Sequence, residues 1–243
     1  MNFSDIISLQ SFKHTIINHN LLINGDCINV LKRIKDKSID LIFIDPPYNI
    51  GKDFGVTKDD CTIYLMCSTQ FMPYLDVYIQ ENYYIVSRIV WVYDSSGVQA
   101  KKYFGSLYEP LLMATKDKKA KYTFNHEDIL VEAKTGAKRK LIDYRCNPPR
   151  PYNTKKVPGN VWNYNRVRYK MKEYTQHPTQ KPVLLLERII KASSNPNDVV
   201  LDIFMGSCTA GVVSSMYNRN FIGIELNEDY YEISVDRLNK KKE

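Results

Sequence analysis

A short turn, Asp45-Pro46-Pro47-Tyr48, follows directly after a nearly continuous apolar run at 39–44. The two prolines stiffen the turn, because each ring fixes its own backbone φ angle. The turn therefore holds a carboxylate, a backbone carbonyl and an aromatic ring in a fixed relation. That set suits a planar heterocycle with an exocyclic amine, which would stack on Tyr48 and donate to Asp45 and to the Pro46 carbonyl. An isolated DPPY is usually only a turn, and the buried strand before it makes the binding interpretation specific.

A second feature is the run at 199–204, which predicts a strand and leads into a loop of small residues at 206–211. A strand that ends in such a loop before a helix forms a ligand-binding crevice in α/β sheets. Glu225 ends the next strand candidate, and an acidic residue at that place commonly binds ribose hydroxyls. These features predict a nucleoside-type cofactor site. The loop lacks the spacing of NAD or ATP sites, and an ordinary turn with a surface glutamate is the simpler alternative.

A third feature is the run HPTQKP at 177–182, which lies just before a helical pattern at 183–192. Proline is tolerated in the first turn of a helix, so Pro182 suits the start of this one. Taken alone, the run is a proline-rich linker. A single histidine such as His177 is more often a surface residue than a ligand.

Short apolar runs that alternate with helical patterns predict an α/β fold to position these features. The run at 39–44 is rich in β-branched and aromatic residues, which is typical of a strand buried on both faces of a parallel sheet. Asn227 is an N-cap candidate, followed by acidic residues that favour the first turn of a helix. Further strands are expected at 21–23, 62–67, 85–93, 107–114, 199–204 and 221–225, and helices at 28–34, 183–192, 209–217 and 228–238.

The connection between the strands expected at 39–44 and 62–67 is unusual. Neighbouring parallel strands need a crossover of about a dozen or more residues, usually containing a helix. Residues 49–61 read NIGKDFGVTKDDC, which is too polar and glycine-rich for a packed helix. Either these strands are not neighbours in the sheet, or a helix-bearing segment is absent from this chain.

The composition bounds the class of protein. The chain has 243 residues, of which 44% are hydrophobic and 25% charged. These values indicate a globular protein of one or two domains and exclude wholesale disorder, a collagen-like fibre and a small disulfide scaffold. No apolar run approaches the roughly 20 residues needed to span a membrane. The five cysteines show no metal-binding spacing and no signal peptide precedes them, so we expect reduced thiols, no metal site and a cytoplasmic location.

The positive charge is concentrated in one segment. The whole chain has 34 Lys and Arg residues against 27 Asp and Glu residues, a net charge of +7. Positions 101–174 contain 18 basic and 7 acidic residues, whereas the rest of the chain has 16 basic and 20 acidic residues. A basic segment on a near-neutral body indicates a polyanionic partner, although a solvated lysine-rich loop would give the same count. Residues 115–175 have few long apolar runs and are predicted to form an inserted, irregular lobe.

Five motifs follow one another in a distinctive order: LINGDC at 22–27, IDLIFIDPPYN at 39–49, HPTQKP at 177–182, LDIFMGSCTAG at 201–211 and FIGIELNEDYYEIS at 221–234. Together they resemble the β-class amino-methyltransferases of DNA, which use S-adenosylmethionine. The runs VEAKTGAKRKLIDYR and VPGNVW also resemble restriction–modification adenine methylases of the HindIII type. In this family the catalytic DPPY lies N-terminal to the cofactor loop, with the target-recognition region between them.

The resemblance implies a Rossmann-like methyltransferase fold with circularly permuted motifs, in which helices cover both faces of a mostly parallel, twisted sheet. Residues 1–114 would form the catalytic half, 115–175 the inserted target-recognition lobe and 176–243 the cofactor-binding half. The implied reaction is methyl transfer from S-adenosylmethionine to the N6 amine of a flipped adenine in duplex DNA, at a specific site, in a restriction–modification or orphan methylation system. Homodimers occur in this family, and a cognate restriction endonuclease is a further partner that the sequence leaves open.

The resemblance also implies a role for each matching residue. Asp45, Pro46, Pro47 and Tyr48 would hold the flipped base and activate its amine. The cofactor-binding residues would be Asp26, Cys27, Asp45, Gln180, Lys181, Asp202, Phe204, Gly206, Ser207, Cys208 and Glu225.

The basic segment supplies the candidates for DNA binding. Most of them are expected to contact phosphates, which position the duplex without specifying its sequence. They are Lys138, Arg139, Lys140, Arg145, Arg150, Lys155, Lys156, Arg166 and Arg168.

Other functions stay open at this point. DPPY occurs less often with N4-cytosine methylation, which is the first alternative. Ile203 replaces the proline usual in this family, Cys208 a common glycine and Ala210 a common threonine. These departures, with the short crossover, motivate the alternative of a DNA-binding protein on a decayed methylase scaffold. Methylation of RNA, or of a protein glutamine, which NPPY would favour, is a further alternative.

Overall fold

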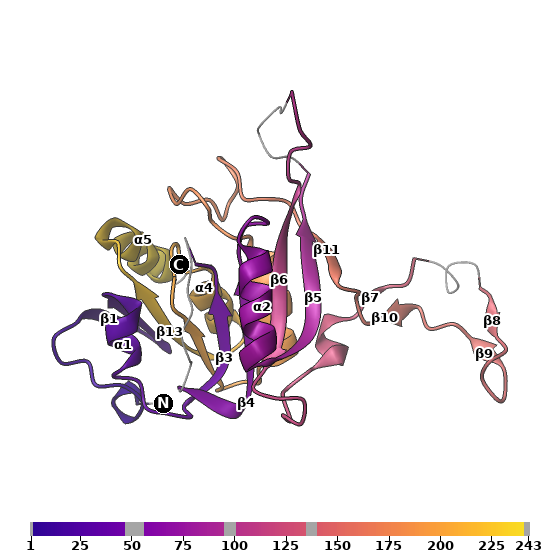
Figure 1. The fold of residues 1–243 in the computed structure, drawn as a ribbon, viewed down its shortest axis with the longest axis horizontal. Coiled ribbons are helices and arrows are strands. Elements are labelled where there is room, and N and C mark those ends of the chain that lie inside the picture. The colour runs from indigo at the N-terminus through magenta and orange to yellow at the C-terminus, as the bar shows by residue number, and fades with distance from the viewer. Residues whose placement is uncertain (1, 47–55, 95–100, 135–139, 241–243) are drawn as a thin grey trace.

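The computed structural model describes residues 2–46, 56–94, 101–134 and 140–240. Within these ranges, nine strands form one sheet in the order β1-β2-β13-β12-β3-β4-β6-β5-β11 (Figure 1). The strands are β1 (Lys13–Ile17), β2 (Asn20–Asn24), β3 (Ile39–Ile44), β4 (Thr57–Met66), β5 (Tyr84–Val92), β6 (Tyr108–Thr115), β11 (Val161–Asn163), β12 (Val199–Asp202) and β13 (Asn220–Glu225).

The sheet is mostly parallel, as predicted. Strands β2, β13, β12, β3 and β4 all run in the same direction. Strand β6 runs antiparallel between β4 and β5, and β1 pairs antiparallel with β2 at one edge. The carboxyl ends of the five parallel strands therefore meet at one edge of the sheet, where open α/β sheets bind their ligands.

Strand β3 begins and ends where the apolar run predicts. Its side chains alternate between two buried clusters, with Ile42 and Ile44 on one face and Leu41 and Phe43 on the other. Burial on both faces is what a continuous apolar run requires. The residue after this strand, Asp45, is thus held at the central carboxyl edge of a rigid sheet.

Helices cover both faces of the sheet (Figure 1). The helices α1 (Cys27–Leu31) and α2 (Met72–Asn82) pack on one face, and α3 (Val183–Ser193), α4 (Thr209–Met216) and α5 (Glu228–Asn239) pack on the other. There are also two short 3₁₀ helices, η1 (Phe3–Asp5) and η2 (His126–Ile129), and Phe3 packs into the same core cluster as α1 and α2. The predicted N-cap of α5 is confirmed, because the side chain of Asn227 accepts a hydrogen bond from the backbone N–H of Tyr230.

The two strands joined by the unusual connection are neighbours in the sheet. Strands β3 and β4 pair in parallel, with Ile42 opposite Ile63 and Ile44 opposite Leu65. The suggestion that they are not sheet neighbours is therefore wrong. Residues 47–55 of the connection lie outside the described residues.

The segment predicted as an irregular lobe divides into two structurally different parts. Strands β7 (Val131–Glu132) and β10 (Lys155–Lys156) pair, as do β8 (Ile142–Asp143) and β9 (Arg150–Pro151), and together they extend away from the sheet. We call the described residues of 131–157 the arm (Figure 1). The following strand, β11, instead joins the main sheet beside β5, and its Trp162 is buried in the core.

No helix among the described residues is long and apolar enough to cross a membrane. All five cysteines lie in the described ranges, and none forms a disulfide. The same ranges contain no group of three or more His, Cys, Asp or Glu side chains arranged to hold a metal ion.

Candidate active site

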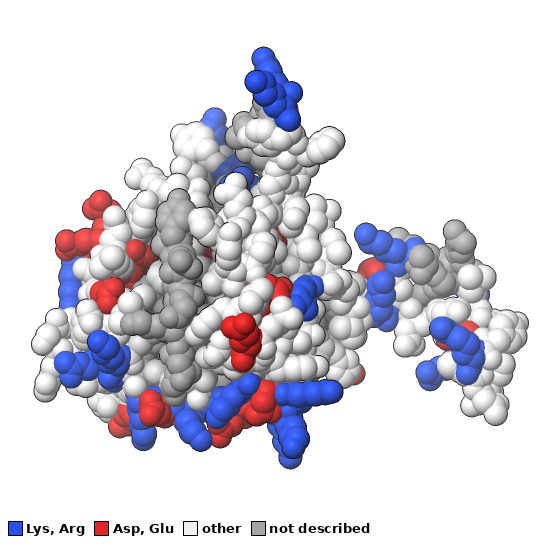
Figure 2. All heavy atoms as spheres, in the orientation of Figure 1, with Lys and Arg blue, Asp and Glu red and all other residues white. Residues whose placement is uncertain are grey.

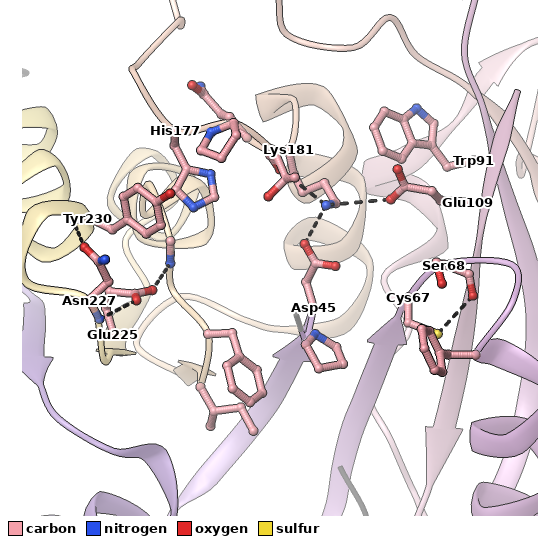
Figure 3. A pocket seen from close by; sticks show the side chains of 18 of the residues that line it. Asp45, Cys67, Ser68, Trp91, Glu109, His177, Lys181, Glu225, Asn227 and Tyr230 are labelled. Carbon is pink, nitrogen blue, oxygen red and sulfur yellow. Dashed lines mark hydrogen bonds and ion pairs between the residues drawn. The ribbon is translucent and has the colours of Figure 1, made fainter. Parts of the chain in front are cut away.

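A cavity of about 1000 Å³ opens at the carboxyl edge of the parallel strands (Figure 3). It has two sides that meet at Asp45, the residue after β3. We call one the β12–β13 side, lined by Gly25, Asp26, Phe204, Gly206, Glu225 and Tyr230 among others. We call the other the β4–β6 side, lined by Cys67, Trp91, Tyr93, Tyr108, Glu109 and Arg166 among others.

A charged triplet occupies the junction of the two sides (Figure 3). The Lys181 Nζ atom lies 2.6 Å from an Asp45 carboxylate oxygen and 3.7 Å from a Glu109 carboxylate oxygen. Burial lowers the pKa of Lys181, but the two carboxylates more than offset this, so its pKa is raised and it carries a proton. One ammonium group is therefore shared by two carboxylates that come from different strands.

Lys181 is held in place by the loop before α3. The buried amide of Gln180 accepts a hydrogen bond from the Thr175 backbone N–H at 2.8 Å and donates to the Glu173 carbonyl oxygen. The Glu173 carboxylate in turn accepts from the backbone N–H of Val183 at the start of the helix. These bonds explain why a run that looks like a linker has a defined shape.

Glu225 organises the β12–β13 side. Its carboxylate accepts hydrogen bonds from the backbone N–H groups of Gly206 and Asn227, both at 2.9 Å. Gly206 has a φ of +51°, and a Cβ atom there would lie 2.9 Å from His177 Nε2. A larger residue would be strained and would clash, so glycine is required at this point of the loop.

His177 is half-buried and lines the cavity, although a single histidine is more often a surface residue. Its ring packs edge-on against Tyr230 with 4.4 Å between ring centroids. Burial lowers its pKa, and the charge of Lys181 lowers it further. The Nδ1 atom is buried and has no hydrogen-bond partner among the described residues, which leaves it available to a ligand.

Asp202 and Ser207 line a second, smaller cavity of about 30 Å³ that shares Asp45 and Lys181 with the large one. The pKa of Asp202 is raised to about 8, chiefly by burial and also by the charges of Asp45 and Glu225. A hydrogen bond from the Phe204 backbone N–H, at 3.1 Å, opposes this rise. Asp202 lines the small cavity but not the large one, so it lies next to the large cavity without facing it.

Cys208 lines neither cavity and is fully buried. Its backbone is left-handed, with φ +60°, just before α4. This conformation explains why glycine is common at this position in the family that the sequence resembles, because glycine adopts it without strain. Of the other two departures, Ile203 lines the large cavity and Ala210 the small one.

Among the named residues of the β4–β6 side, the sequence predicted a role for Arg166 alone, and the others carried no local signal. The indole N–H of Trp91 donates to the Tyr164 carbonyl oxygen at 2.8 Å, and the Arg166 guanidinium lies 5.0 Å from the Tyr93 ring centroid. Burial, and then the charge of Glu109, raises the pKa of Tyr93. Glu109 reaches the cavity because β6 is antiparallel, so its start lies where the parallel strands end.

The structure separates the predicted DNA-binding residues. Arg145 pairs with Asp143 on the arm at 2.9 Å, whereas Arg166 lines the cavity and Arg168 donates to both carboxylate oxygens of Asp94. Figure 2 shows basic side chains along the arm. Lys140, Arg145, Arg150, Lys155 and Lys156 are exposed there. Pro47, Tyr48, Lys138 and Arg139 lie outside the described residues.

The residues present fit a nucleoside-type cofactor. The cavity reaches the upper end of the volume of small-molecule sites, about 300–1000 Å³, so it has room for a cofactor and a second group. Its β12–β13 side offers the acidic groups Asp26 and Glu225 for hydroxyl or amine donors and the unpaired His177 Nδ1. Of the predicted cofactor-binding residues, Cys27, Gln180 and Phe204 also line it.

Comparison with known proteins agrees with this architecture. The model of a family described as DNA methylase matches residues 54–236. The DNA adenine methyltransferase YhdJ of Escherichia coli K12 is 54% identical over 241 residues, covering 89% of this chain and 82% of that protein. The type II methyltransferase M.HpaI of Haemophilus parainfluenzae is 36% identical over 247 residues, with coverages of 90% and 74%.

Solved structures share the fold. The M1.HpyAVI–SAM complex is 27% identical with a TM-score of 0.65, covering 89% of this chain and 98% of that chain. The cytosine-N4-specific PvuII DNA methyltransferase has a TM-score of 0.68 at 16% identity, covering 90% and 86%. The predicted α/β methyltransferase fold is thus confirmed. With the match to most of its length and a 54% identical relative, the chain belongs to the DNA methylase family.

Proposed function

We propose that this protein transfers a methyl group from S-adenosylmethionine to the N6 amine of adenine in duplex DNA. The observation that carries the proposal is Asp45, which follows the central strand β3 and lies at the junction of the two sides of the cavity. A group at this junction would contact a base on one side and the methyl donor on the other. The 54% identical relative is itself named a DNA adenine methyltransferase.

Asp45 and Pro46 are proposed to orient the target amine. S-adenosylmethionine supplies a methyl group on a positively charged sulfur. The Asp45 carboxylate and the Pro46 carbonyl would accept the two N–H groups of the amine, which directs its nitrogen lone pair at that methyl. With the cofactor bound, the bond from the methyl carbon to sulfur would break as the bond to nitrogen forms, and the methylated amine would then lose one proton. Lys181 contacts one Asp45 carboxylate oxygen at 2.6 Å, so the other oxygen would accept from the amine.

The β12–β13 side is proposed to bind the cofactor. Glu225 would accept from the ribose hydroxyls while it holds the Gly206 and Asn227 N–H groups. Asp26 would approach the adenine ring of the cofactor. Lys181 would approach the carboxylate of the cofactor. Phe204, Gly206, Gln180 and Cys27 complete the lining, while Asp202, Ser207 and the fully buried Cys208 support the loop from behind.

The β4–β6 side is proposed to receive the flipped base, and the arm to bind the phosphate backbone. Flipping costs a few kcal/mol, as a rough value, which contacts in the cavity and along the duplex must offset. Pro47 and Tyr48 are proposed to complete the base site, and Lys138 and Arg139 to join the exposed basic residues of the arm. Phosphate contacts predict an affinity that falls steeply with salt.

The division of the chain at 1–114, 115–175 and 176–243 is proposed as functional rather than as separate folding units, because β11 belongs to the main sheet. A cytoplasmic location is part of the same proposal. Homodimerisation and a cognate restriction endonuclease are part of the same proposal. Light scattering with and without DNA tests whether the protein forms a homodimer. A cleavage assay on unmethylated DNA, with the proteins encoded by adjacent genes, tests for a cognate restriction endonuclease.

The reaction is tested by incubating DNA with the protein and methyl-labelled S-adenosylmethionine, then digesting the DNA to nucleosides for mass spectrometry. Labelled N6-methyl-2′-deoxyadenosine supports the proposal. Label in N4-methylcytosine alone would favour the alternative target. An absence of label, in a preparation that binds the cofactor, would contradict methyl transfer to DNA.

A further inference from the structure

The connection between β5 and β6 ends in an exposed aromatic tip. Within the described part of this connection, Phe104 has a relative exposure of 103% and Tyr103 of 70%. The two residues before them, Lys101 and Lys102, are also exposed. Figure 1 shows the tip projecting from the edge of the sheet, and Figure 2 shows basic side chains at its end.

The tip stands at the rim of the β4–β6 side. Ser106 lines the cavity only two residues after Phe104, a distance that the chain spans in at most about 7 Å. The base of the connection is fixed, because the Tyr93 backbone N–H donates to the Leu107 carbonyl oxygen at 3.0 Å. Ser106 Oγ also donates to the Tyr108 carbonyl oxygen at 2.9 Å. An anchored loop therefore presents a bare aromatic ring beside the place where a flipped base would enter.

The chemistry of the tip fits a duplex. Phe104 has no polar atom that would favour water, and its ring gains most by entering an apolar space such as a base stack. The ammonium groups of Lys101 and Lys102 complement the phosphates that flank a base step. A nucleotide that leaves the stack opens a gap there, and an aromatic ring can fill it because every base presents a π face.

We propose that Phe104 enters the DNA base stack and fills the gap left by the flipped nucleotide, with Tyr103 packing beside it. This inference rests on the proposed function. It assigns Phe104 to flipping rather than to methyl transfer, so the residue acts by stabilising the extrahelical state of the target adenine.

The test compares two unmethylated DNA duplexes that contain the sequence which the protein methylates. In one, the target adenine lies opposite thymine, and in the other it lies opposite an abasic position. Removing the partner base lowers the cost of flipping. Phe104→Ala should lower kcat/KM on the paired duplex by about 5- to 160-fold, which is the range for losing one base–aromatic stack. On the abasic duplex, the kcat/KM of Phe104→Ala should stay within about twofold of that of the unmodified protein. Phe104→Trp keeps an aromatic ring, so it should retain activity on the paired duplex.

A second measurement does not depend on methyl transfer. 2-Aminopurine at the target position brightens when it leaves the stack, and Phe104→Ala should reduce this increase on the paired duplex. Tyr84→Ala is the matched control, because Tyr84 is an exposed aromatic residue at the opposite end of the same β5–β6 pair; it should change neither reading. Phe104→Ala with unchanged activity on both duplexes, or with an equal loss on both, would overturn the proposal. A failure of the proposed function looks different, because the unmodified protein would then methylate neither duplex.

Discussion

The two sides of the cavity differ in how the chain builds them. On the β12–β13 side, key lining residues stand at or just after the ends of parallel strands, as Asp26 follows β2, Phe204 follows β12 and Glu225 ends β13. On the β4–β6 side, Glu109 comes from the start of an antiparallel strand and Arg166 from a loop after β11. A cofactor site therefore arises from local rules of parallel sheets, whereas the target site depends on long-range pairing.

Removing the group at the junction should produce the largest effect. Asp45→Ala should lower methyl transfer by about 1000-fold or more, because the variant loses the acceptor that orients the amine. Lys181 keeps Glu109 as a partner, so the fold and the β12–β13 side should survive. Calorimetry should find cofactor affinity within a few-fold of the unmodified protein. Near-normal transfer in this variant would show that Asp45 does not orient the target amine.

A change confined to the β12–β13 side should affect the cofactor alone. Glu225→Ala should weaken cofactor binding by about 10- to 100-fold, the range for hydrogen bonds to a charged group. DNA affinity, measured by fluorescence anisotropy, should stay within twofold. Glu225→Gln is the matched control, since it keeps an acceptor for the Gly206 N–H and should lose less. Equal losses of cofactor and DNA affinity would mean that the two sides are not separate.

The buried carboxyl group behind this side should make stability depend on pH. The folded pKa of Asp202 lies at about 8, above its ordinary value, so the folded state binds more protons than the unfolded state. Stability is then highest below the ordinary aspartate pKa and falls as the pH rises towards 8. The free energy of unfolding should fall between pH 5 and pH 8 in the unmodified protein. In Asp202→Asn this fall should be smaller, by on the order of 2 kcal/mol. Urea unfolding measures this, and Asp36→Asn, an exposed site, should show no such difference.

The smallest effect is expected outside both sides, on the arm. Lys155→Ala with Lys156→Ala should weaken DNA binding by about tenfold and lower the slope of log affinity against log salt by about two. Cofactor affinity should not change. Lys118→Ala with Lys119→Ala, at the opposite edge of the sheet, is the control. If the control pair weakened binding as much as the arm pair, the arm would have no special role.

The fold could be predicted wherever the chain is locally regular. The strand at 39–44 and the cap at Asn227 are confirmed because both depend on neighbouring residues alone. Helix α2 was missed although Pro73 stands in its first turn, since Tyr74, Val77 and Tyr78 obscure the apolar spacing of its buried face. Strand β11 was missed because its three residues take their structure from pairing with β5.

The site shows the same division between local and long-range structure. The sequence predicted Asp26, Phe204 and Glu225 at the cavity, but not Glu109, whose position requires knowing that β6 is antiparallel. The contact of Arg168 with DNA stays a prediction, and the sequence did not show that Arg168 pairs with Asp94, which lies 74 residues earlier in the chain. Long-range pairs of this kind leave no signal in local spacing.

Sequencing of modified bases at single-base resolution tests the central claim most directly. DNA is incubated with the protein and S-adenosylmethionine, and each methylated position is mapped. We expect methylated adenines within one short sequence, and none after incubation with Asp45→Ala. Methyl groups on cytosine alone, or unmodified DNA from a protein that binds both cofactor and DNA, would contradict it.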